Sequence, residues 1–115
     1  MELGRVFRNG EPLWRQVWRA DRPWTRARGL LGRPRLEEGQ GMLILPCNSV
    51  HSWWMGYPLD LVYLDGGGRV VKLVEGLKPW RFSACRQARA VLELAPGAIG
   101  KHALQVGDEL SWKNG

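Results

Sequence analysis

The sequence predicts an all-β protein, mainly strands with one or two short helices, arranged as a single sandwich or barrel-like domain over residues 1–115. A chain of 115 residues is the size of one ordinary domain with a single core. Short apolar segments alternate with Gly, Pro, Asn and Asp along the whole length, which is typical of many short strands. No segment sustains helical periodicity for more than about three turns.

A hairpin is predicted at the start of the chain. Val6 and Phe7 are followed by Asn9-Gly10, a pair that adopts the positive φ of a tight turn, and residues 13–20 return as the second strand. Alternation along this strand would place Trp14, Gln16 and Trp18 on one face and the residues between them on the other.

The best helix candidate spans residues 22–31. Asp21 can cap its first turn, Pro23 suits the first helical position, and Gly32 and Pro34 would end it. The remaining strands are predicted at 42–45, 59–64, 70–74, 91–94 and 110–112, and the Asp-Gly-Gly-Gly run at 65–68 joins two of them as a hairpin.

All of the net charge of +6 lies in the first third of the chain. Residues 1–35 hold nine arginines and three acidic residues, together with Trp14, Trp18 and Trp24. Arginine interleaved with aromatic residues is one footprint of nucleic-acid binding, because guanidinium groups pair with phosphates and rings stack on bases. The alternative is a solvated basic face whose tryptophans point inward.

Cysteine and histidine spacing gives only a weak metal signal. Cys47 and His51 have the spacing of a zinc-ligand pair, but Cys85 and His102 are too widely separated to complete such a site. We therefore expect no metal and no cofactor. A Cys47–Cys85 disulfide and two ordinary half-buried thiols both stay open as interpretations.

The sequence shows no complete catalytic constellation and favours a non-enzymatic function. It contains no G-x-S-x-G motif, and the three glycines at 66–68 lack the Lys-Ser/Thr that would follow in a phosphate loop. A hydrolase that uses His51, Asp60 or Glu93 is a weaker hypothesis, because no partner that would orient them is identifiable.

No apolar run approaches the roughly 20 residues that cross a bilayer, and the start of the chain lacks the apolar segment of a secretory signal. We expect no membrane span and a cytoplasmic location.

The densest cluster of large apolar side chains with an acidic neighbour is HSWWMGYPLDLVYLD, residues 51–65. Asp60 in this stretch could sit beside Trp53, Trp54 and Trp80 at the mouth of a pocket, an arrangement suited to a sugar or a cation. If Trp53 and Trp54 lie on a strand they point to opposite faces, so one of them would enter the core. Alternatively, Asp60 bonds backbone N–H groups in a turn.

Motifs spread over about residues 15–112 resemble the DUF192 family, also called UPF0127. The resemblance implies a small, mostly β domain without an established activity. Its patterned positions in this sequence are Arg28, Gly29, Leu30, Gly32, Gly41, Met42, Trp54, Met55, Pro58, Leu59, Asp60, Glu93, Gly97, Gly107 and Asp108.

We expect the helix that carries Arg28, the Trp54-Met55 segment and Asp60 to meet at one site, with Arg28 free to pair with Asp60 or Glu93. The favoured function is binding of a small polar or carbohydrate-like ligand. Nucleic-acid or acidic-partner binding through the basic N-terminal third is the alternative. The predicted ligand-binding residues are Trp54, Met55, Asp60, Trp80 and Arg28.

Overall fold

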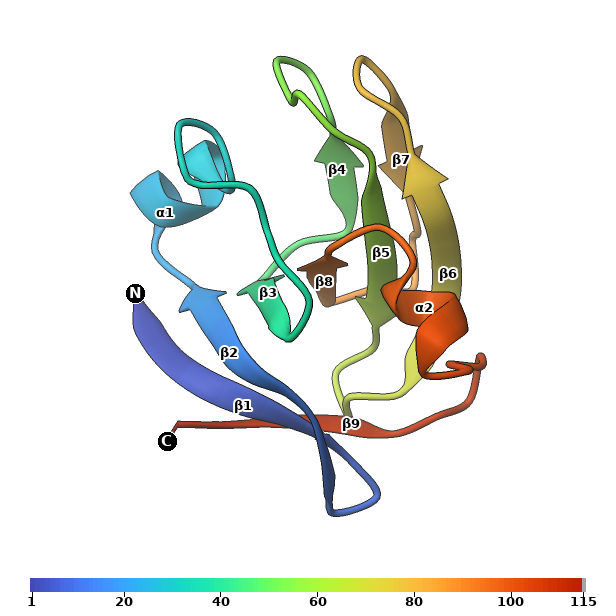
Figure 1. Cartoon of the computed structure of the whole chain (residues 1–115). Coiled ribbons are helices and arrows are strands. Elements are labelled where there is room, and N and C mark those ends of the chain that lie inside the picture. Colours follow the sequence, from blue (N-terminus) through green and yellow to red (C-terminus); the bar gives the residue numbers. More distant parts are fainter. Residues whose placement is uncertain (115) are drawn as a thin grey trace.

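A computed structural model describes residues 1–114 of the chain. The described residues form nine strands and two short helices, which confirms the predicted mainly-β class (Figure 1). In chain order the elements are β1 (Glu2–Arg8), β2 (Glu11–Ala20), α1 (Pro23–Arg28), β3 (Gln40–Ile44), β4 (Ser49–His51), β5 (Leu59–Leu64), β6 (Val70–Leu77), β7 (Phe82–Ala84), β8 (Ala90–Leu94), α2 (Ala98–Lys101) and β9 (Leu110–Asn114).

Seven strands form one sheet in the order β6-β5-β8-β3-β2-β1-β9, and β4 pairs with β7 in a separate two-stranded sheet. All neighbours in the large sheet are antiparallel except β2 and β3. Its two edges meet at one point, where Val70 N–H donates to the carbonyl of Asp108 and Leu110 N–H donates to that of Gly68, each at 2.8 Å. The sheet therefore closes on itself as a barrel, because hydrogen bonds and the Arg69–Glu109 bridge join the segments where β6 and β9 begin.

The central strands β5 and β8 are buried on both faces along their whole length. One face packs Val62 and Leu92 into an apolar cluster with residues of β1, β2, β9 and α2. The other face packs Leu61 and Val91 with side chains from the segment after α1 and from β4. Strand alternation therefore assigns each residue of β5 and β8 to one of two separate cores.

The predicted alternation along the second strand is wrong between Trp14 and Val17. Val17 pairs with Gly4 and Trp14 with Val6, so β2 contains one residue more than β1 over this stretch. Such a bulge shifts the pattern of faces by one position. Trp14 and Val17 are consequently both buried in the same cluster.

The predicted helix at 22–31 ends earlier, at Arg28, because Gly29 adopts a φ of 53°. Its cap also differs from the prediction: Arg22 N–H donates to Oγ1 of Thr25, whereas Asp21 pairs with Arg19. Among the described residues, neither helix has the length and apolar character needed to cross a membrane.

Trp53 and Trp54 do not lie on a strand, which corrects the expectation that one of them enters the core. They follow β4 in a turn, and their side chains are 49% and 74% exposed. The strands β4 and β7, which the sequence did not predict, have only three residues each. Elements this short carry too few alternating positions to form a recognisable pattern.

We predict that Gly68→Ala weakens the closure of the barrel. Gly68 has a φ of 84°, and a Cβ at this position would overlap the carbonyl of Leu110. The combined strain and steric conflict should lower the free energy of unfolding by about 3 kcal/mol, measured by urea denaturation. Gly66→Ala in the same turn is the matched control, since its nearest contact would be an ordinary 3.9 Å to Arg89. Equal stability of the two variants would contradict the proposed closure.

Candidate ligand-binding site

A cavity of about 140 Å³ lies between α1, the segment that leads into β4, and the turn that follows β4. It is lined by parts of the chain that are more than 60 residues apart in the sequence. Its polar, aromatic and sulfur-containing lining comprises Arg26, Arg28, Cys47, Ser49, His51, Trp53, Met55 and Glu93.

Glu93 is the buried carboxyl group of this cavity. It lies in the middle of β8, only 5% of its surface is exposed, and its side chain faces the same core as Val91. Burial raises the pKa of Glu93 from 4.5 to about 7, and no charged or hydrogen-bonding partner among residues 1–114 opposes that shift. The group therefore changes charge near neutral pH inside a partly enclosed space.

Two arginines from the last turn of α1 also line the cavity. Arg26 donates from Nη1 to the carbonyl of Pro46 at 3.1 Å, and its buried Nε has no partner in the described part of the chain. Arg28 donates from Nε to the carbonyl of Leu31 at 2.9 Å. Both guanidinium groups are thus held in place by backbone oxygens and still have other N–H groups to offer.

The opposite wall carries an aromatic pair and a thiol. The rings of His51 and Trp53 lie 4.8 Å apart at an interplanar angle of 33°. The thiol of Cys47 donates to the carbonyl of Ser49, and burial raises its pKa. A raised pKa lowers the thiolate fraction, which is the opposite of the shift that activates a nucleophilic cysteine. Cys47 and Cys85 are both free thiols.

Asp60 lies on the other side of the sheet from this cavity. In the antiparallel pair of β5 and β8, Asp60 is opposite Leu94, whereas Leu61 is opposite Glu93. Asp60 is 1% exposed, and its carboxylate accepts hydrogen bonds from the N–H groups of Gly76 and Ile99, each at 2.9 Å. Asp60 therefore connects β5 to β6 and to α2.

The other predicted site residues are divided between two places. Arg28 and Met55 line the cavity. Trp54 and Trp80 instead form an edge-to-face pair outside it, with ring centroids 4.7 Å apart and both side chains more than half exposed. Arg28 makes no ion pair with Asp60 or Glu93 among the described residues.

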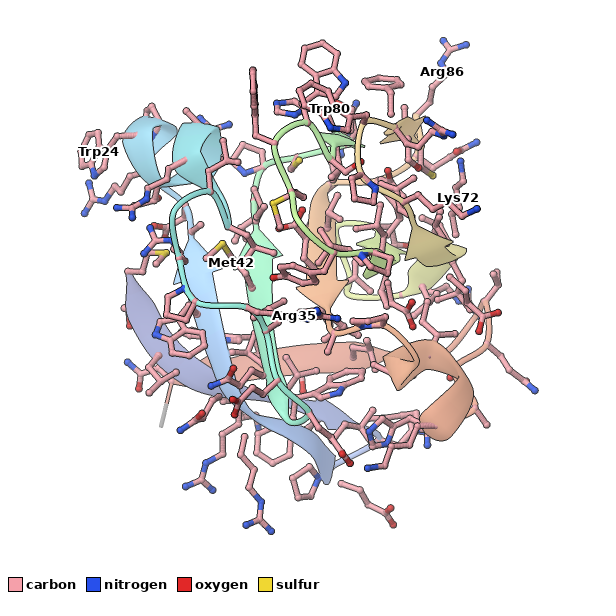
Figure 2. All side chains as sticks on the ribbon, turned by 45° about the horizontal axis from the view of Figure 1, so that its top comes forward. Trp24, Arg35, Met42, Lys72, Trp80 and Arg86 are labelled. Atoms are coloured by element: carbon pink, nitrogen blue, oxygen red, sulfur yellow. The ribbon has the colours of Figure 1, made fainter. Side chains whose placement is uncertain are left out.

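The basic side chains of the N-terminal third lie on several surfaces of the molecule. Arg8 pairs with Asp108, and Arg35 lies over the ring of Tyr57. Trp14 is buried in the barrel, whereas Trp24 on α1 is 68% exposed and points away from the body of the molecule (Figure 2). Many of these arginines are thus engaged within the protein.

Glu93 could have been singled out from the sequence. It is the one acidic residue in the apolar run of residues 91–94, which was correctly predicted as a strand. A charged residue in a fully buried strand is unfavourable unless it is paired or functional. The segment that covers Glu93 could not be predicted from the sequence.

We predict that Asp60→Asn destabilises the fold. The new amide can accept only one of the two backbone N–H groups and turns a donor towards the other, which should cost about 2 to 3 kcal/mol in chemical denaturation. Asp21→Asn, which alters a partly exposed ion pair with Arg19, should cost less than about 1 kcal/mol. If both variants were equally stable, Asp60 would not have the structural role described.

A second prediction concerns the pH dependence contributed by Glu93. The folded protein holds the Glu93 proton up to about pH 7, whereas the unfolded chain releases it near 4.5, so stability falls as pH rises through this window. Glu93→Gln removes that loss. Between pH 4 and pH 8 the free energy of unfolding of the variant, measured with urea, should rise by about 3 kcal/mol relative to that of the wild type. If the free energies of unfolding of the two proteins changed equally with pH, the pKa of Glu93 would not be raised.

Two solved structures share this fold. A protein of unknown function from Novosphingobium aromaticivorans superimposes with a TM-score of 0.81 at 22% identity, covering 96% of this chain and 84% of the other. A Sinorhizobium meliloti protein, provisionally described as a transcription regulator, gives a TM-score of 0.81 at 23% identity and covers 96% and 92%. At these identities the likeness establishes the fold alone.

Two archaeal UPF0127 proteins are similar in sequence. The chain is 31% identical to one from Thermococcus sibiricus over 100 residues, covering 82% of this chain, and 38% identical to one from Pyrococcus furiosus over 65 residues, covering 56%. It spans 64% and 55% of the lengths of these relatives. The DUF192 family, described as "Uncharacterized ACR", matches residues 5–112. The chain therefore belongs to the DUF192 (UPF0127) family.

Proposed function

We propose that this domain binds a small polar ligand in the cavity between α1 and β4. The observation that carries the proposal is the buried carboxyl group of Glu93, which lines the cavity without a charged partner among residues 1–114. A carboxyl group in such surroundings is unfavourable unless a bound molecule supplies hydrogen bonds.

The surrounding groups define the chemistry of the ligand. Ionised Glu93 accepts hydrogen bonds, whereas Arg26 and Arg28 donate them. The ring of Trp53 and the side chain of Met55 add apolar contact area. A molecule that bears both donors and acceptors around a compact apolar frame suits this set, as small sugars and polyols do.

The proposed ligand set keeps Arg28 and Met55 from the residues expected on sequence grounds and adds Arg26, Trp53 and Glu93. Asp60 is assigned to the scaffold, because both of its oxygens are occupied by backbone N–H groups. Trp54 and Trp80 lie outside the cavity and are not part of this ligand set.

Nucleic-acid or acidic-partner binding through the N-terminal third is a second candidate. It is favoured by the exposed side chains of Arg5, Arg15, Arg22 and Trp24. Binding of this kind weakens steeply with salt, since counterions are released from the phosphates. The affinity for a neutral sugar or polyol in the cavity should change little over the same range of salt concentration.

The proposal can be tested by titrating ¹⁵N-labelled protein with small sugars, polyols and amino acids. We expect shifts at residues 26–31 and 47–55, with at least a tenfold loss of affinity in Arg28→Ala, since a hydrogen bond to a charged group is worth about 1.5 to 3 kcal/mol. Arg15→Ala is the control, because Arg15 is exposed on β2 and does not line this cavity. Shifts centred elsewhere, or equal affinities of the two variants, would contradict the proposal.

A further inference from the structure

Four of the five exposed aromatic side chains lie close together, and we call them the aromatic tip: Trp53, Trp54, Trp80 and Phe82. They come from the loop between β4 and β5 and from the region where β6 leads into β7, which project at the same end of the molecule (Figure 1). Trp80 is one of the outermost side chains there (Figure 2). Exposed fractions of 49% to 74% make this an unusually apolar surface for a free protein.

A buried serine holds the two loops of the aromatic tip together. Ser52 is fully buried, its hydroxyl donates to the carbonyl of Lys78 at 2.6 Å, and it accepts from Arg81 N–H at 2.9 Å. Backbone hydrogen bonds join Ser52 N–H to the carbonyl of Arg81 and Trp80 N–H to the carbonyl of Ser52. The backbone that carries the exposed rings is therefore held in place before any partner binds, which lowers the entropy lost on binding.

Two residues of the aromatic tip have a strained backbone conformation. Trp54 and Trp80 have φ values of 69° and 64°, a region that large side chains rarely adopt. Residues held in this conformation cluster at functional sites. Because the same two residues form the edge-to-face pair, the strain and the exposed rings occur together.

The charge around the aromatic tip has a single sign. Residues 46–59 and 78–88 contain no acidic residue, and their basic residues are Lys78, Arg81 and Arg86. All three are exposed, and none of them forms an ion pair within residues 1–114. Aromatic rings together with unpaired cations complement a surface that is apolar below an anionic layer.

We propose that the aromatic tip docks on an anionic phospholipid surface. The rings of Trp54, Trp80 and Phe82 would enter the interface, where indole rings are favoured, while Lys78 and Arg81 would contact lipid phosphates. A single-stranded nucleic acid also stacks on aromatic rings, but such strands run along grooves. These rings stand on two projecting loops and outside the cavity beside α1, which fits insertion into a planar surface better.

The test is co-sedimentation of the whole chain with vesicles of phosphatidylcholine containing 30% phosphatidylserine, compared with pure phosphatidylcholine. We expect binding to the anionic vesicles that weakens with salt, and quenching of tryptophan fluorescence by brominated lipid. Trp54→Asn/Trp80→Asn should lower the partition coefficient at least tenfold. Asparagine is chosen because it tolerates positive φ. Val106→Ser, an equally exposed apolar residue in the loop after α2, should bind like the wild type.

A charge variant keeps the proposal testable if the tryptophan variant fails to fold. Arg81→Glu/Arg86→Glu changes exposed side chains and should weaken binding at least tenfold, whereas Arg5→Glu/Arg15→Glu on β1 and β2 should weaken it much less. Absence of wild-type binding, or equal loss in both charge variants, would overturn the proposal. So would binding of poly(U) that the tryptophan substitutions abolish while vesicle binding is unchanged.

Discussion

The antiparallel register between β5 and β8 is the constraint on which the rest of the structure depends. It places Asp60 opposite Leu94 and Leu61 opposite Glu93, in two strands that are buried on both faces. Since facing residues in a ladder share a face, the two buried acidic residues of the sheet point into different cores. A register shifted by one residue would bring both carboxyl groups to the same face of the sheet.

The two acidic residues consequently have different roles. Asp60 accepts two backbone hydrogen bonds and so joins α2 and the β6 backbone to β5. Glu93 lines the cavity beside α1, where burial raises its pKa to about 7. A sequence departs from the rules of core packing mainly where function requires it, so the less satisfied of the two groups marks the candidate site.

The sequence predicted those parts of the fold that depend on local chemistry. Asn9-Gly10 and the turn at 65–68 indicated hairpins, and the apolar runs at 59–64 and 91–94 indicated the doubly buried strands. The bulge in β2 was missed because it depends on the partner strand. The cavity was missed because the segments that cover Glu93 are α1 and the turn after β4, and no local signal gives their packing.

The cavity and the aromatic tip lie next to each other, because Trp53 belongs to both. Their chemistry differs, with a buried carboxyl group in one and exposed rings with unpaired cations in the other. The proposed ligand site depends most on the burial of Glu93. Titration of its carboxyl carbon by ¹³C NMR tests this burial directly, and we predict a midpoint near pH 7. A midpoint near 4.5, the value of a solvated glutamate, would contradict it.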